Sequence, residues 1–190
     1  MARICIISAS KEGQAAKIAD RIGLHLTQLG HAVIRRAATD TDSIDLDTID
    51  GLIAGGSIHV GKHDPTLASF VQRHRAQLET KPTAFFSVSL SAAGSEIRQQ
   101  ADAKRLLNEF LTSTGWRPDL TATFAGALRY TQYGFVKRWL LKRIAGKEGG
   151  DTDTARDHEY TDWASVEAFA RAFAAMTQAP NQPSSSEGSA

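Results

Sequence analysis

The stretch RICIISASKEGQAAKIADRIGLHLTQLG, residues 3–30, contains a strand signal, a polar turn and a helix signal in direct succession. Its first part, Arg3–Ile7, is a short apolar run rich in β-branched residues, which is typical of a buried strand. Isoleucine and leucine then recur at positions 18, 22, 26 and 29, the spacing of one helix face, and Gly30 marks the end of the helix. A strand followed at once by a helix predicts the first unit of a parallel α/β sheet.

The rest of the chain repeats this alternation. Four more apolar runs indicate strands at Ala32–Arg36, Gly51–Ala54, Thr83–Leu90 and Leu120–Leu128. Helix signals follow at Asp64-Pro65, across Ala103–Leu111 and from Thr161 onward. Five strands alternating with helices predict a doubly wound parallel sheet with helices on both faces, in which ligands bind at the carboxyl ends of the strands.

The composition is that of an ordinary globular protein. The chain has 190 residues, of which 42% are apolar and 23% charged, and this suits one domain with a substantial core. Cys5 is the single cysteine, and its apolar neighbours predict a buried thiol in a reducing compartment. No apolar stretch approaches the ~20 residues that span a bilayer, so we expect neither a signal peptide nor a membrane-spanning helix.

The segment Arg129–Lys147 concentrates positive charge, with six Lys or Arg residues and no Asp or Glu, interleaved with aromatic and aliphatic side chains. Such a segment suits an anionic small molecule, an anionic lipid surface or a nucleic acid. One short patch on an otherwise acidic chain argues against nucleic acid. We expect a single domain at 1–176 that carries an insertion at about 129–158. The composition of 177–190 predicts a disordered tail.

Small and polar residues follow four of the predicted strands, at what would be one edge of the sheet. Ser8–Gln14 follows the first strand, and its backbone N–H groups, together with the helix behind them, suit a phosphate. Gly55–Gly61 follows the third strand, and its glycines predict close approach to a flat ligand. Ser87–Ser91 and Gly126–Tyr130 follow the fourth and fifth strands. The sequence contains no Ser/His/Asp set and no His/Cys spacing typical of a metal site, so no catalytic residue is assigned.

Seven short motifs occur in a fixed order along the chain. They are Gly13-Gln14, Gly56-Ser57-Ile58, Phe86-Ser87-Val88, Gly115-Trp116-Arg117-Pro118, Ala125–Tyr130, Gly149-Gly150 with Thr152-Asp153-Thr154, and Tyr160–Trp163. Together they resemble the menaquinone-dependent protoporphyrinogen IX dehydrogenases, a family of flavodoxin-like, FMN-binding enzymes of bacterial haem synthesis. The resemblance covers residues 3–174. It implies a five-stranded parallel sheet in the order 2-1-3-4-5, with an insertion in the fifth strand.

The resemblance also implies the activity and the site. The implied reaction is the oxidation of protoporphyrinogen IX to protoporphyrin IX, with FMN as cofactor and a membrane quinone, menaquinone or ubiquinone, as electron acceptor. The implied FMN-binding residues are Ser10, Lys11, Glu12, Gly13, Gln14, Ala15, Ser57, Ile58, His59, Val60, Gly61, Ser87, Val88, Ser89, Leu90, Gly126, Ala127, Leu128, Tyr130 and Thr154. Since the propionates of the substrate are anionic, Arg129, Lys137 and Arg138 are their candidate partners.

The sequence departs from the family in the first loop. Ala9 and Ala15 stand where the family commonly has hydroxyl residues, which removes two hydrogen bonds to the phosphate. Each such bond is worth roughly 0.5–1.5 kcal/mol. Ser10 and the charge of Lys11 offset part of this loss. We therefore expect FMN to bind more weakly than in relatives.

Two other function classes stay open: an NAD(P)H:quinone reductase of the same fold and a flavodoxin-type electron carrier. No motif indicates a nicotinamide site, and the cationic segment argues against a carrier, which should be strongly acidic. Because the quinone lies in the membrane, whose anionic lipids attract basic segments, we expect a cytoplasmic protein associated with the inner face of the bacterial cell membrane. Homo-oligomerisation is left open.

Overall fold

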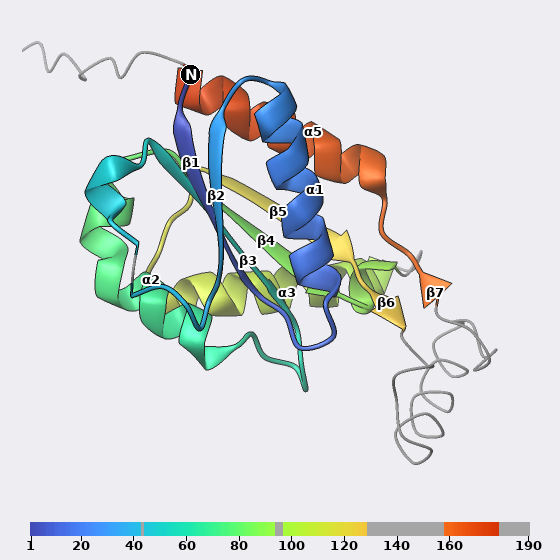
Figure 1. Cartoon of the computed structure of the whole chain (residues 1–190). Coiled ribbons are helices and arrows are strands. Elements are labelled where there is room, and N and C mark those ends of the chain that lie inside the picture. The colour runs from blue at the N-terminus through green and yellow to red at the C-terminus, as the bar shows by residue number, and fades with distance from the viewer. Residues whose placement is uncertain (43, 94–96, 129–157, 179–190) are drawn as a thin grey trace, which may run out of the picture.

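The computed structural model describes residues 1–42, 44–93, 97–128 and 158–178, and its centre is a five-stranded parallel sheet (Figure 1). The strands are β1 (Arg3–Ala9), β2 (Ala32–Ala37), β3 (Gly51–Ser57), β4 (Thr83–Ser89) and β5 (Leu120–Ala125). Their order is β2-β1-β3-β4-β5, and each neighbouring pair is parallel. The predicted doubly wound fold with the order 2-1-3-4-5 is confirmed.

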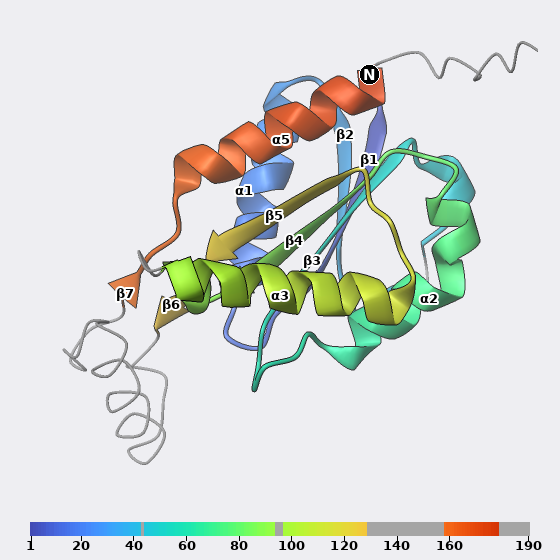
Figure 2. The ribbon, with the colours of Figure 1, turned by 180° about the vertical axis from the view of Figure 1, so that it is seen from behind.

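Two layers of helices enclose the sheet. The helices are α1 (Gln14–Gln28), α2 (Pro65–Leu78), α3 (Ile97–Thr114) and α5 (Trp163–Gln178). The connections also contain the short 3-10 turns η1 (Leu46–Thr48) and η2 (Ser91–Ala93). Figures 1 and 2 show α1 and α5 on one face of the sheet, and α2 and α3 on the other. Helix α5 includes the first two residues of the predicted tail. Its last residue, Gln178, places its side-chain nitrogen 3.2 Å from His31 Nε2. Residues 179–190 lie outside the described part of the chain.

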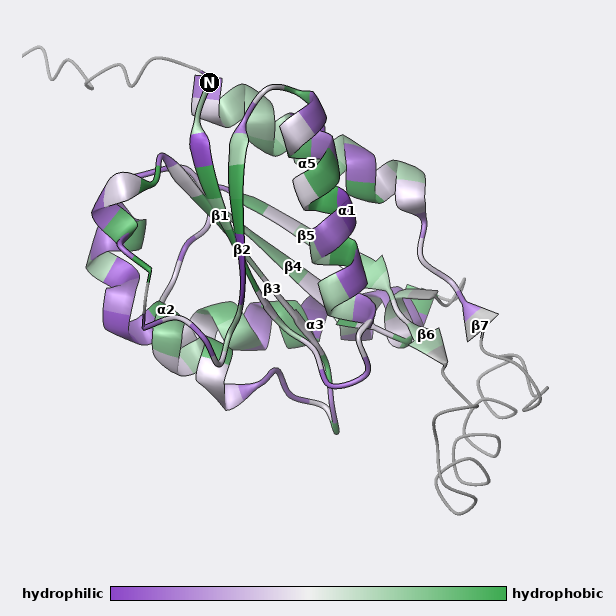
Figure 3. Ribbon diagram, in the orientation of Figure 1, coloured by the Kyte–Doolittle hydropathy of each residue, from purple (hydrophilic) through white to green (hydrophobic). Residues whose placement is uncertain are grey.

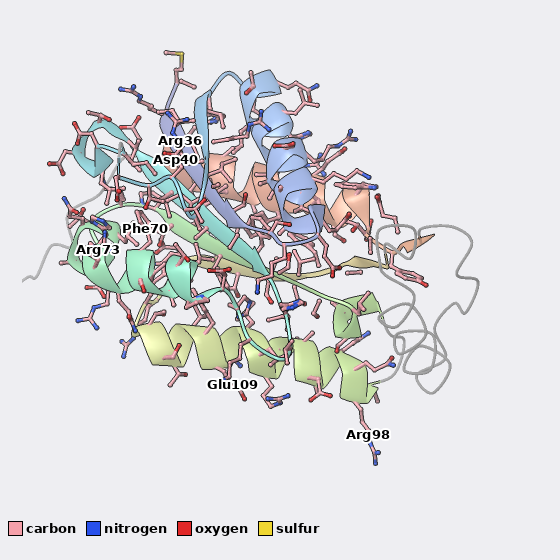
Figure 4. All side chains as sticks on the ribbon, turned by 60° about the horizontal axis from the view of Figure 1, so that its bottom comes forward. Arg36, Asp40, Phe70, Arg73, Arg98 and Glu109 are labelled. Atoms are coloured by element: carbon pink, nitrogen blue, oxygen red, sulfur yellow. The ribbon has the colours of Figure 1, made fainter. Side chains whose placement is uncertain are left out.

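Alternation along β1 divides the interior into two cores. Ile4 and Ile6 pack with α1 and α5, whereas Cys5 and Ile7 face α2 and α3. Figure 3 shows the hydrophobic residues gathered on the strands and on the helix faces turned toward them. The predicted face of α1 is fully buried except Leu29, which is the C-terminal cap and is 42% exposed. On the outside, Arg98 and Glu109 of α3 point away from the sheet (Figure 4).

The fifth strand is shorter than predicted, because the chain changes partner at Gly126. The Gly126 N–H still donates to Ser89 O of β4 (3.0 Å), but its carbonyl accepts from the Tyr160 N–H (3.2 Å). The next residues form β6 (Ala127–Leu128), which pairs antiparallel with β7 (His158–Glu159). β6 and β7 thus lie at the two ends of the predicted insertion, and residues 129–157 lie outside the described residues.

Candidate functional site

The loop between β1 and α1 provides the start of a helix that no side chain caps. Gly13 is the N-cap, and its φ of 84° lies in the left-handed region that favours glycine. The Ser10 hydroxyl oxygen is buried and has no hydrogen-bond partner among the described residues. A buried hydroxyl beside an uncapped helix start is suited to an anion such as a phosphate, because the helix dipole favours negative charge there.

The loop after β3 carries a strained turn. The Ile58 N–H donates to Val88 O of β4 (2.8 Å), and His59 and Lys62 exchange backbone hydrogen bonds of 2.8 and 3.2 Å. Val60 lies between them with a φ of 50° and is 89% exposed. A β-branched residue in this region costs on the order of 1–3 kcal/mol, and such strain clusters at ligand-contact positions. The turn therefore holds an apolar side chain at the carboxyl edge of the sheet, where a flat ring can pack.

Gly55 and Gly56 serve the core rather than a ligand, which corrects the expectation from the sequence. A methyl group built on Gly55 would overlap the tip of the Phe86 ring, which is fully buried. A methyl group on Gly56 would lie 3.2 Å from Leu67 and 3.5 Å from His63. Side chains from neighbouring elements fill the space above both glycines. A ligand therefore cannot approach the backbone from that side.

His63 ties the loop after β3 to strand β4. Its Nε2 lies 3.0 Å from the Ser87 hydroxyl, and its ring centroid is 5.3 Å from Phe85 and 4.9 Å from Phe110. Burial lowers the pKa of His63 to about 4, so the ring is neutral at pH 7. His63 therefore acts as a neutral packing and hydrogen-bonding group beneath the loops.

The parallel sheet brings the loops after β1, β3, β4 and β5 to one edge, as predicted (Figure 2). Among the predicted binding residues, Gln14, Ala15, Ser87, Val88 and Ser89 are buried, whereas Lys11, His59, Val60 and Leu90 are exposed. The predicted residues Arg129, Tyr130, Lys137, Arg138 and Thr154 lie outside the described residues. The exposed apolar side chains of Val60 and Leu90 thus lie on loops that the resemblance places beside the flavin.

The segment that follows β7 contacts α1, a contact that no sequence pattern indicated. Gln14 Nε2 donates to Thr161 Oγ1 (2.8 Å), and Lys17 forms an ion pair with Glu159. Burial raises the pKa of Glu159, but hydrogen bonds from Lys17, Trp163 and Gln14 and the charge of Lys17 lower it below its usual value overall. The Tyr160–Trp163 motif marked this segment in the sequence, but it did not indicate that Glu159 and Thr161 contact α1.

Two kinds of site are absent from the part of the chain that the structure describes. No three His, Cys, Asp or Glu side chains there are grouped to hold a metal ion. None of the helices in those ranges is long and apolar enough to cross a membrane. Cys5 is free and buried, and burial raises the pKa of its thiol to about 11, so it is not a reactive thiolate at neutral pH.

The five-stranded parallel sheet in the order 2-1-3-4-5 and the uncapped helix start after β1 define the flavodoxin-like class of doubly wound proteins. A family model described as a flavodoxin domain matches residues 5–155. A protein of Escherichia coli (strain K12) named protoporphyrinogen IX dehydrogenase (quinone) is 33% identical over 175 residues, which are 92% of this chain and 96% of that protein. This chain therefore belongs to the flavodoxin domain family and, within it, to the protoporphyrinogen IX dehydrogenase (quinone) family.

Further relatives agree with this assignment. A Leishmania major protein of the same name is 37% identical over 145 residues, which are 76% of this chain and 62% of that protein. A short-chain flavodoxin associated with a bacterial microcompartment superposes with a TM-score of 0.57 and 13% identity, covering 93% of this chain and 99% of its own. At that identity the structural likeness supports the fold alone.

Proposed function

We propose that this protein oxidises protoporphyrinogen IX to protoporphyrin IX in haem biosynthesis and passes the electrons to a membrane quinone, menaquinone or ubiquinone. The observation that carries the proposal is the 33% identity over 92% of the chain to a protein of that name. The substrate loses its hydrogens in three two-electron steps, and each step reduces one quinone to a quinol. A bound redox cofactor would accept the electrons of each step from the substrate and deliver them to the quinone.

The proposed cofactor is FMN, which would supply this electron transfer when bound. The buried, unpartnered Ser10 hydroxyl and the uncapped start of α1 fit its phosphate. The residues Ser57–Gly61 and Ser87–Leu90 would flank the ring system, with Gly126–Leu128 close by. The role of the protein is to bind and orient the cofactor, and the proposal includes Tyr130 and Thr154 in the same site.

The proposal extends to the partners of the basic segment. Arg129, Lys137 and Arg138 would bind the propionates of the substrate through charge-assisted hydrogen bonds. The segment 129–147 would also hold the protein on anionic lipid at the inner face of the cell membrane, beside its quinone. Retention of the protein by anionic vesicles at low ionic strength tests the lipid contact, and its failure to bind them would exclude it.

The test of the function is spectroscopic. Protoporphyrinogen IX added under anaerobic conditions to the FMN-loaded protein should bleach the flavin absorbance, and a menaquinone analogue should restore it. Bleaching by NAD(P)H but not by the porphyrinogen would instead favour the quinone reductase. A protein that does not take up FMN would exclude both functions.

Replacing Ser10 with alanine should raise the dissociation constant of FMN about tenfold, because the phosphate loses one charge-assisted hydrogen bond. Riboflavin, which lacks the phosphate, should bind the variant and the wild type alike. Quenching of flavin fluorescence measures both affinities. Ser113→Ala is the matched control, since its hydroxyl donates to Phe110 O (2.9 Å) at the far end of α3. Equal loss of FMN and riboflavin binding in Ser10→Ala would show that Ser10 does not contact the phosphate.

A further inference from the structure

Thr161 connects three segments through one hydroxyl group. It follows β7, it is only 9% exposed, and its Oγ1 donates to the carbonyl of Ala125, the last residue of β5, at 2.7 Å. The same oxygen accepts from Nε2 of Gln14, the first residue of α1, at 2.8 Å. The end of β5, the start of α1 and the segment after the predicted insertion therefore meet at this side chain.

The hydrogen-bond chemistry fixes the orientation of the Gln14 amide. A backbone carbonyl can only accept, so the single hydrogen of the Thr161 hydroxyl is committed to Ala125. Thr161 must then accept from Gln14, which turns the Gln14 nitrogen toward Thr161 and the Gln14 oxygen away from it. This oxygen, Oε1, is buried and has no partner among the described residues, and Gln14 itself is only 4% exposed.

Neighbouring contacts hold Thr161 in this position. Glu159 forms an ion pair with Lys17 of α1 and accepts from Trp163 Nε1 of α5 at 2.8 Å. Lys17 Nζ lies 5.4 Å from the centroid of the Trp163 ring, within the range of a cation–π contact. The backbone on either side of Thr161 is thus tied to two helices, and Thr161 has a fixed place beside the loop that ends at Gln14.

We propose that Thr161 is a positioning residue for the flavin site, acting through Gln14. By fixing the amide, Thr161 presents a buried hydrogen-bond acceptor beside the start of α1. A phosphate dianion has no hydrogen to donate to such an acceptor, whereas a hydroxyl of the ribityl chain does. The inference rests on the proposed flavin cofactor. It assigns Gln14 to the ribityl chain and Ser10 to the phosphate.

The test compares FMN and riboflavin, which share the ribityl chain. Thr161→Val removes one partner of the Gln14 amide nitrogen and leaves the Glu159 carboxylate to hold it, so the amide is fixed less firmly. The dissociation constants of both flavins should rise about tenfold, measured by fluorescence quenching of the full chain. The loss of affinity for both flavins distinguishes Thr161→Val from Ser10→Ala, which should weaken the binding of FMN alone. Thr161→Ser keeps the hydroxyl and should restore both affinities.

Thr114→Val is the matched control, because it also removes a buried threonine hydroxyl, one bonded to Phe110 O at 2.9 Å far from the site. It should leave both affinities unchanged. The proposal is overturned if Thr161→Val binds both flavins like the wild type, if Thr161→Ser binds as weakly as the valine variant, or if Thr114→Val weakens binding as much. Absence of flavin binding by the wild type would instead overturn the proposed function.

Discussion

Replacing Gly55 with alanine should lower the free energy of unfolding by about 3 kcal/mol, at the upper end of the usual cost of an overpacked core. Gly55 of β3 lies opposite Phe86 of β4, and the tip of the Phe86 ring covers its α-carbon. The ring cannot move aside easily, because it also packs against Phe124 and Phe169, with ring centroids 6.0 and 6.4 Å away. Urea unfolding of the flavin-free protein measures the loss.

Two further variants show whether the overlap is the cause. Gly23→Ala is the matched control. The added methyl group would meet the flexible Arg35 side chain at 3.1 Å and would lie at ordinary contact distance, 3.5 Å, from Ile6 and Val33, and alanine favours the helix by about 1 kcal/mol. Adding Phe86→Leu to Gly55→Ala should recover part of the loss, because the smaller side chain leaves room for the methyl group. If Gly55→Ala unfolds at the same urea concentration as the wild type, the Phe86 ring does not lie over Gly55.

Acidification from pH 7 to pH 5 should remove about 2 kcal/mol of stability through His63 alone. Burial lowers the pKa of His63 from 6.5 to about 4 in the folded protein. The unfolded chain therefore binds a proton as the pH falls through 6.5, while the folded chain stays neutral until about pH 4. The stability that comes from keeping His63 neutral is fully present above pH 6.5 and is lost as the pH falls from 6.5 to about 4.

His63→Gln should flatten this part of the pH dependence while keeping a polar group beside Ser87. Ser87→Ala should retain the pH dependence, because burial is the cause of the lowered pKa and the ring stays between Phe85 and Phe110. Urea unfolding at a series of pH values measures both variants. If His63→Gln and the wild type lose the same stability between pH 7 and pH 5, another titrating group causes the pH dependence. NMR titration of the imidazole gives the pKa directly.

Local patterns predicted much of the fold. Asp64 caps α2 and Pro65 is its first residue, as the pair indicated, and the predicted apolar face of α1 is buried apart from Leu29. These signals succeed because a helix cap and a helix face depend on residues a few positions apart. The strand predicted at Leu120–Leu128 ends at Ala125 instead, because the carbonyl of Gly126 takes its partner from a residue beyond the insertion. No local pattern carries that pairing.

Local sequence patterns were enough to predict the alternation of strands and helices and the glycine before α1. The order of the motifs pointed to the loops of the proposed flavin site. The contacts of those loops are visible in the folded structure and in no local pattern. Gln14 meets Thr161 across 147 positions of sequence, His63 meets Ser87, and Gly55 makes room for Phe86. The physical reason is that strand order and register bring these side chains together, and both are set by the packing of the whole sheet between its helices.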